Sequence, residues 1–247
     1  PQITYRPKNL TIRDFLLSNG KQQIMISGGV SGTTPSTLAL KLKDIDLSTA
    51  NIFLSSDMPL SGSLDGFVYF SSPSGTNAGL KAELLCSDLG IGRARAGNIH
   101  LTAHLDDEDD LFKFTLTNGI SEKDYAIKMD GSYNALSNYL NARLSLNSFN
   151  PNVIQPALTG MCFLLDGAVD GKVNASGPLD HISVQSNGLS LTNLRVGLVP
   201  TGVTYTLNGR MRYEQENLIV DRIDIRDGKK GSAMLSGKVP DLTLRLD

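Results

Sequence analysis

Apolar residues recur at every second position over most of the chain, and this alternation constrains the fold more than any other feature. In TLALKLK (37–43) the three leucines share one face, and in NIHLTAHLD (98–106) every second residue from Ile99 to Leu105 is apolar. The same period occurs in FKFTL, RLSL, GLSL, VTYTLN and DRIDIRD. Since successive side chains of a strand point to opposite faces, each segment predicts a strand with one apolar and one polar face. We therefore expect an all-β fold made largely of antiparallel strands.

Short turn signals and two short helices are predicted between these strands. The chain has 24 glycines and no tryptophan, and SNGK, SPSG, TNG, MDG, LNG and RDG separate the alternating segments. LSTANIFLSS predicts a helix capped by Asp46. NPNVIQPALTG predicts a second helix, with Asn150 as its cap, Pro151 in its first turn and Gly160 at its end.

One phrase occurs twice. GSLDGFV (62–68) and GAVDGKV (167–173) share a pattern at a separation of 105 residues, and each follows one of the predicted helices. The strands before those helices, LKLKDID and LSLNSFN, match at an offset of 104. FLLSNGKQQIMISGGV matches IDIRDGKKGSAMLSGKV at 208, which is twice 104, and FTLTNGISEKDYAIKMDGSY supplies a looser middle copy.

These matches predict a single elongated β-repeat domain over residues 1–247, with repeats of about 104 residues. The predicted parts are the end of a preceding unit (1–35), unit one (36–140) and unit two (141–247). Because the chain starts and stops in strand-like sequence, PQITYRP and LTLRLD, we expect it to be a piece of a longer protein.

The aspartates of the repeated phrase are better explained by structure than by chemistry. Asp65 and Asp170 are single acids 105 residues apart, whereas a calcium coil needs acid-bearing turns at short intervals and Ca²⁺ takes about six to eight oxygens. We expect a tight turn or bulge whose glycines reach positive φ while the Asp bonds the backbone locally. The positions given this structural role are Gly62, Asp65, Gly66, Gly167, Asp170 and Gly171.

No other group of residues predicts catalysis or metal binding. The acidic run HLDDEDD (104–110) predicts a solvated loop. His100 and His104 are four strand rises apart, about 13 Å, which is too far for one zinc ion. His181, beside Asp180, predicts an exposed turn. A β-rich glycoside hydrolase would need two facing carboxylates in a cleft, whereas the acids here fall at turns or on polar faces. The sequence therefore predicts no enzyme, no metal and no cofactor.

Charge and hydropathy exclude further classes of protein. The net charge is −2 with both signs interspersed, so no basic stripe predicts nucleic acid or an anionic membrane surface. No apolar run approaches the ~20 residues that cross a bilayer, and no signal peptide is recognisable. Cys162 predicts a buried small hydrophobe, and a disulfide with Cys86 stays open.

Three long segments resemble one family. LTIRDFLLSNGKQQIMISGGVSG, LALKLKDIDLSTANIFLSSDMPLSGSLDGFVYF and VTYTLNGRMRYEQENLIVDRIDIRDGKKGSAMLSGKV are similar to the conserved C-terminal region of the TamB family, the inner-membrane-anchored subunits of the translocation and assembly module. The likeness covers nearly the whole chain and rests on dispersed Gly, Asp and aliphatic positions rather than on a catalytic signature.

The resemblance implies an AsmA-like, bridge-type lipid-transfer protein in the periplasm of a Gram-negative bacterium. It implies a β-taco, which is an elongated, curved sheet with an apolar concave groove, and a part in outer-membrane biogenesis. That part is phospholipid movement, assembly of outer-membrane proteins, or both. The implied partners are a phospholipid or other lipid and an Omp85-type outer-membrane barrel (TamA-like), the barrel through other parts of the full-length protein. Neither the membrane anchor nor a barrel-docking segment is recognisable in this sequence.

The alternating aliphatic residues are the candidates for the lining of such a groove, which would shield acyl chains at about 0.8 kcal/mol per CH₂. They are Leu38, Leu40, Leu42, Ile99, Leu101, Phe112, Phe114, Leu116, Leu144, Leu146, Leu189, Leu191, Val203, Tyr205 and Leu207. The same alternation is expected of an ordinary sandwich core. The alternative function is therefore a structural or adhesive β-solenoid or β-sandwich segment of a secreted surface protein.

Overall fold

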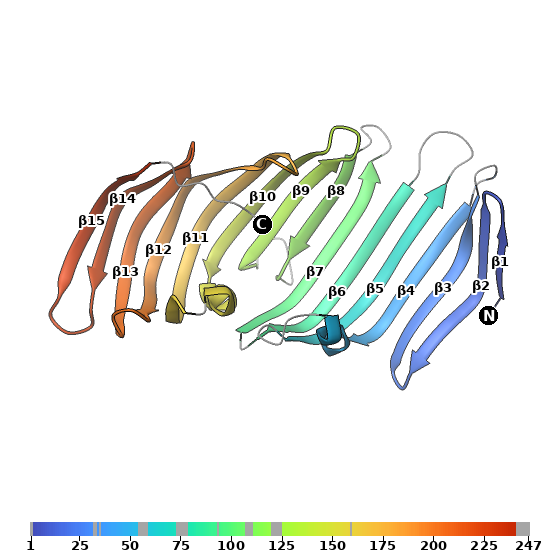
Figure 1. Ribbon diagram of the computed structural model, residues 1–247, viewed down its shortest axis with the longest axis horizontal. Helices are drawn as coiled ribbons and strands as arrows, with labels where there is room; N and C mark the ends of the chain where they lie inside the picture. The colour runs from blue at the N-terminus through green and yellow to red at the C-terminus, as the bar shows by residue number, and fades with distance from the viewer. Residues whose placement is uncertain are drawn as a thin grey trace.

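A single open sheet of antiparallel strands makes up almost the whole structure (Figure 1). The computed structural model describes residues 2–31, 34, 36–53, 59–72, 79–92, 94–106, 111–119, 125–158 and 160–240. The sheet has 15 strands in plain sequence order, each hydrogen-bonded only to its neighbours along the chain. The expectation of an all-β, elongated and curved antiparallel sheet is confirmed.

The strands are β1 (Gln2–Arg6), β2 (Asn9–Asn19), β3 (Gln22–Ser31), β4 (Ser36–Asp46), β5 (Leu60–Ser72), β6 (Gly79–Ile91), β7 (Ala94–Asp106), β8 (Leu111–Thr117), β9 (Ile127–Asn134), β10 (Tyr139–Phe149), β11 (Cys162–Pro178), β12 (Ser183–Leu198), β13 (Val203–Glu214), β14 (Asn217–Arg226) and β15 (Ser232–Val239). Two 3₁₀ helices, η1 (Leu47–Phe53) and η2 (Pro151–Leu158), connect β4 to β5 and β10 to β11.

The register of the strands joins their apolar faces into one surface. Residues paired directly across antiparallel strands share a face. One row of such pairs, here called the central row, runs without a break from β2 to β15. Its members are Leu17, Ile24, Leu42, Gly66, Leu84, Leu101, Leu116, Met129, Leu144, Val173, Ser186, Tyr213, Leu218 and Val239. All of these residues are apolar except Gly66 and Ser186.

β-Bulges preserve this face where the alternation in the sequence changes phase. Leu42 and Ile45 are three residues apart, so an unbroken strand would place them on opposite faces. They pair with Gly66 and Leu64, which are two residues apart, because one extra residue bulges out of β4. Asp44 in that bulge has φ 51°. The bulge therefore returns Ile45 to the apolar face.

Each of three bulges is held by a side chain of the next strand. The backbone N–H of Asp44 donates to Asp65 Oδ1 at 3.0 Å, and the N–H of Ser148 donates to Asp170 Oδ1 at 2.7 Å. Likewise, the N–H of Asn193 donates to Asn208 Oδ1 at 2.8 Å. Ser148 and Asn193 have φ of 47° and 48°, in the same left-handed region as Asp44. A hydrogen-bond donor that the bulge removes from the ladder thereby finds an acceptor.

These contacts decide the role of the repeated phrase. Its residues lie inside β5 and β11, so the predicted turn is not formed and the predicted bulge is found on the facing strands β4 and β10. The aspartates bind backbone, as predicted, but across strands rather than locally. The glycines have positive φ as predicted, with Gly66 at 144° and Gly171 at 142°. A Cβ on Gly66 would collide with the carbonyl oxygen of Glu83.

Both predicted helices form, as short 3₁₀ segments with the predicted caps. Asp46 Oδ1 accepts the N–H of Ser48 at 2.8 Å. Hydrogen bonding by the Ser48 side chain, and next by this backbone N–H, lowers the pKa of the Asp46 carboxyl. Asn150 Oδ1 accepts the N–H of Asn152 at 3.0 Å. Gly160, the predicted end of the second helix, has φ 89°.

Each helix also carries a side-chain amide that hydrogen-bonds to the backbone of the following strand, in the place of a neighbouring strand. Asn51 of η1 binds the N–H and the carbonyl of Leu60 at 2.7 and 2.9 Å. Gln155 of η2 accepts the N–H of Leu165 at 3.1 Å and donates to the carbonyl of Phe163 at 3.2 Å. η2 contacts β7 as well as β11, and lies beyond the ends of the short strands β8 and β9 (Figure 1).

Several of these features recur at the spacing of the predicted repeat. Asp46 and Asn150 both cap a 3₁₀ helix and differ by 104 positions, and Asp65 and Asp170 differ by 105. The sheet is continuous through residues 36 and 141, where the predicted units begin. The division into units therefore stays a prediction.

Two of the predicted turns are wrong. MDG (129–131) lies within β9 and LNG (207–209) lies within β13. SNGK and RDG form the hairpins that join β2 to β3 and β14 to β15, as predicted. Most of SPSG (72–75) and residues 107–110 of the acidic run lie outside the described residues.

Candidate functional site

No second layer formed by the described residues covers the apolar face of the sheet. The chain exposes 15912 Å², and a compact protein of 26.6 kDa is expected to expose about 10,700 Å². Among the described residues, no large side chain is less than 2% exposed, as the centre of a sandwich would require. The exposed area is about one half larger than this expectation, because the strands form one open sheet whose two faces both meet solvent.

The two faces differ in chemistry. Opposite the apolar face, the pairs of β7 to β12 form rows of polar side chains. One such row is Thr102, Thr115, Asp130, Arg143, Asn174 and Gln185. Two adjacent leucines of β6 show the difference in environment: Leu84, in the central row, is half-buried, whereas Leu85, on the polar face, is 42% exposed. Side chains on the apolar face therefore pack against one another even without a covering layer.

Small residues beside the central row let this packing occur. Ala82, Ala103, Gly131 and Ala142 lie in one row of cross-strand pairs, in which Phe114 is the large member. Ala103 is only 5% exposed. The Phe114 ring lies over Gly131, where any Cβ would collide with it. Larger side chains on either side can therefore lean toward each other over the small ones.

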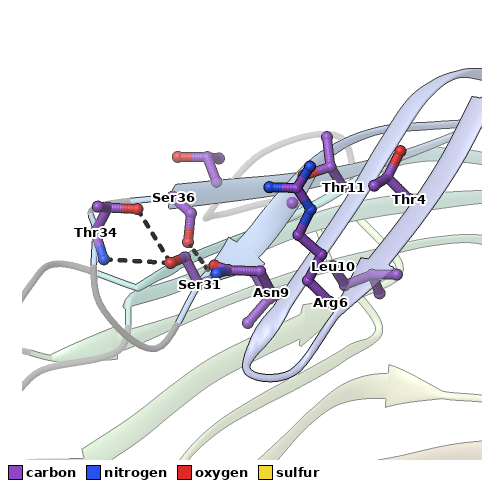
Figure 2. Close-up of a pocket in the computed structure, with 11 residues that line it drawn as sticks. Thr4, Arg6, Asn9, Leu10, Thr11, Ser31, Thr34 and Ser36 are labelled. Atoms are coloured by element: carbon purple, nitrogen blue, oxygen red, sulfur yellow. Dashed lines mark hydrogen bonds between the residues drawn. The ribbon is translucent and has the colours of Figure 1, made fainter.

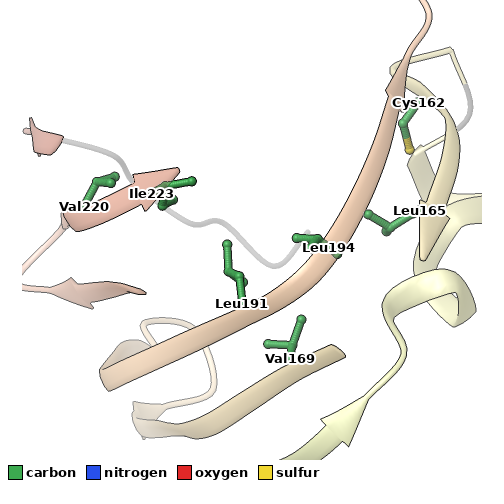
Figure 3. Packing of buried hydrophobic residues seen from close by; sticks show 7 residues of the cluster. All are labelled: Cys162, Leu165, Val169, Leu191, Leu194, Val220 and Ile223. Atoms are coloured by element: carbon green, nitrogen blue, oxygen red, sulfur yellow. The ribbon is translucent and has the colours of Figure 1, made fainter. Parts of the chain in front are cut away.

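The C-terminal part of the apolar face is its most buried region. The cluster is formed by Cys162, Leu165, Val169, Leu191, Leu194, Val220 and Ile223. In Figure 3 the strand β12 is bent, and Leu191 and Leu194 lie on the concave side of the bend. Ile223 pairs with Gly209, which in turn pairs with Leu191, so a glycine separates two large side chains of the cluster. The curvature and the glycine together bring side chains from non-adjacent strands into contact.

The register places all of the predicted lining residues on the apolar face. Leu38 faces Phe70 on β5, and Leu146 faces Gly171 on β11. At the other end of the sheet, Val203 faces Leu198. Sequence reasoning missed further members of this face. They include Val68, Ala82, Leu84, Met129, Leu165, Leu194 and Val220. Alternation from Leu80 to Cys86 was a usable signal for β6, although Leu85 interrupts it.

Within the described ranges, the titratable groups do not gather into a site. His100 Nε2 and Glu83 Oε1 lie 3.2 Å apart on the polar face. Over the residues with described positions, no three His, Cys, Asp or Glu side chains come together as metal ligands. Cys86 and Cys162 are free thiols and both are buried, so the disulfide left open by the sequence is not formed. Burial raises the pKa of the Cys86 thiol.

No helix in the described part of the chain is long and apolar enough to span a membrane. In comparisons with known proteins, the chain matches no protein family, no curated protein and no solved structure. The similarity to the TamB family therefore rests on the residues quoted above.

Proposed function

We propose that the chain is a non-enzymatic β-groove that shields phospholipid acyl chains, or apolar segments of outer-membrane protein clients, from water. In this proposal it belongs to a longer, inner-membrane-anchored, TamB-like protein of the periplasm. That protein would serve outer-membrane biogenesis together with an Omp85-type barrel bound through other parts of the molecule. The observation that carries the proposal is the central row, which is continuous from β2 to β15 and over which the described part of the chain places no second layer.

Continuity is what lipid movement along a sheet requires. Neighbouring strands lie about 4.8 Å apart, so the 13 spacings from β2 to β15 give a path of about 62 Å. Exposing a chain of about 16 CH₂ groups to water costs on the order of 13 kcal/mol. A stretch of polar side chains in the path would expose part of the acyl chain, and part of that free energy would then become a barrier to movement of the lipid. The central row has no charged member, and Ser186 in it is only 4% exposed.

The chemistry of the polar face also favours binding of a lipid on the apolar face. Burying the charged side chains of the polar face, such as Lys113, Asp130 and Arg143, under an acyl chain would be unfavourable. A lipid would thus lie on the apolar face with its head group toward solvent. An adhesive or structural segment is the alternative, and it makes no use of this difference between the faces.

Leu84 and Leu85 allow a matched test of the proposal. The photoreactive residue p-benzoyl-phenylalanine replaces either leucine in the 247-residue chain, which is expressed in the periplasm of a Gram-negative host and irradiated before lysis. We expect mass spectrometry to find phospholipid adducts at Leu84, on the apolar face, and several-fold fewer at Leu85, on the polar face. Equal labelling at the two positions, or no lipid at either, contradicts the proposal and favours the adhesive alternative.

A further inference from the structure

A second candidate site lies on the polar face, at the N-terminal end of the sheet. It is a cavity of about 400 Å³ between the ends of β1 to β4, a size typical of small-molecule sites. The lining residues are Thr4, Arg6, Asn9, Leu10, Thr11, Gly29, Val30, Ser31, Thr34, Ser36 and Thr37 (Figure 2). Seven of them carry a hydroxyl or amide side chain, and Arg6 is the only charged one.

A hydrogen-bond network fixes one wall of this cavity. Ser31 Oγ accepts the backbone N–H of Thr34 at 3.2 Å and the hydroxyl of Thr34 at 3.0 Å. The N–H of Ser31 donates to Ser36 Oγ at 2.8 Å. Ser31 is 9% exposed, so its position is set by packing as well as by these bonds. Three hydroxyl groups are thereby held close together before any ligand arrives.

The floor of the cavity is open because Gly29 has no side chain. Gly29 pairs with Thr11, which pairs with Thr4, so the three lie in one row on the polar face. A Cβ on Gly29 would collide with the carbonyl oxygen of Leu10. In Figure 2 the side chain of Arg6 extends toward Thr11, across the lining residues.

We propose that this cavity binds a small phosphate-type anion that carries hydroxyl groups, such as a phosphorylated polyol. The Arg6 guanidinium has no carboxylate among the lining residues to neutralise it, and guanidinium binds phosphate through paired N–H donors. A carboxylate has two oxygens, which Arg6 alone can satisfy. The hydroxyl and amide groups of the lining are further hydrogen-bonding groups beyond Arg6. They match a ligand that has more oxygens than a carboxylate, namely phosphate oxygens and hydroxyl groups on carbon.

The test is a titration of the 247-residue chain followed by amide NMR. The probes are glycerol 3-phosphate, inorganic phosphate and glycerol. We expect glycerol 3-phosphate to shift the amide signals of Thr11, Ser31 and Thr34, inorganic phosphate to bind more weakly, and glycerol to shift none of them. Arg6→Gln should weaken binding of glycerol 3-phosphate about 10-fold or more, because it removes a charge-assisted hydrogen bond. Arg13→Gln, at a position paired with Gln2 and outside the cavity, should leave binding unchanged.

The absence of shifts overturns the proposal. So do equal shifts with glycerol, or equal losses in the two arginine variants. A short-chain phosphatidylglycerol below its micelle concentration separates two sources of the same chemistry. Tighter binding than glycerol 3-phosphate assigns the site to a lipid head group, and equal binding assigns it to a soluble phosphate ester. The central row lies on the other face, so photolabelling at Leu84 reports on the apolar groove independently of this result.

Discussion

Replacement of Asp65 by alanine tests whether the repeated phrase stabilises a bulge. Asp65 Oδ1 is the acceptor for the backbone N–H of Asp44, 21 residues away and partly buried. Alanine removes the acceptor and leaves that N–H without a partner in the bulge. A hydrogen bond to a charged group is worth about 1.5–3 kcal/mol, which corresponds to a factor of about 10 to 150 in a local opening equilibrium.

Native-state hydrogen exchange measures this opening at one amide. In Asp65→Ala we expect the Asp44 amide to exchange about 10 to 150 times faster, while the equivalent amide of Ser148, held by Asp170, keeps its rate. Asp170→Ala should reverse this pattern. Asp65→Asn keeps an acceptor oxygen, as Asn208 supplies one for Asn193, so it should lose about half as much free energy.

Asp221→Ala is the control, because Asp221 is an exposed strand aspartate whose carboxylate pairs with the Arg212 side chain instead of a backbone N–H, although Asp221 itself lies in a bulge of β14. It should change the exchange of Asp44 and Ser148 very little. An unchanged exchange rate of the Asp44 amide in Asp65→Ala would show that Asp65 does not stabilise the bulge. An equal acceleration in Asp65→Asn and Asp65→Ala would show that the acceptor oxygen is not what stabilises it.

Two further predictions concern a glycine and a thiol. Gly171→Ala should lower the melting temperature more than Gly188→Ala. Both positions have positive φ, at 142° and 136°, so both variants strain the backbone. Of the two, only the new Cβ at position 171 would meet neighbouring atoms, including the backbone oxygen of Gly188. Calorimetry of both variants checks this, and an equal or smaller effect at Gly171 contradicts it. Because burial raises the pKa of the Cys86 thiol, its alkylation by iodoacetamide in a Cys162→Ser background should reach half-maximal rate at a higher pH in the folded than in the denatured chain. Mass spectrometry of quenched samples measures that midpoint, and a folded midpoint at or below the denatured one contradicts the prediction.

Strands with one apolar face were predictable because their signal is local. TLALKLK and NIHLTAHLD show the alternation within a few residues, and both lie in strands as expected, β4 and β7. Part of the bulge signal was also present, since the alternation changes phase between Leu42 and Ile45. The sequence of β4 alone does not show which group accepts the N–H of Asp44, because that acceptor, Asp65, lies on β5.

Asx-Gly pairs show why local signals fail elsewhere. Asp227-Gly228 turns a hairpin, whereas Asn208-Gly209 continues through β13 opposite a bulge of β12. Both pairs allow the same backbone conformations, and the facing strand decides which one forms. The choice between a sandwich and an open sheet is equally non-local, because the sequence of a strand shows the same alternation of apolar residues whether or not another layer covers its apolar face.

The cavity of β1 to β4 could not be found from the sequence for a related reason. Its hydroxyl groups come from four strands and from Thr34 between β3 and β4, and they are spread over 34 positions, from Thr4 to Thr37. Thr and Ser alternate with apolar residues there as on any polar face. Only the register, which places Gly29 beside Thr11, leaves the space that makes them a pocket.

The plain meander of the sheet makes length an additive property of this chain. Since every strand hydrogen-bonds only to its neighbours, a further hairpin at an end of the sheet extends the apolar face by about 9.6 Å and leaves the existing strand pairs in place. A globular core grows in volume and must be repacked as residues are added, whereas this architecture grows in one dimension. Evolution can thus adjust the span of such a protein by duplicating or deleting hairpins, because the number of strands sets the length of the sheet.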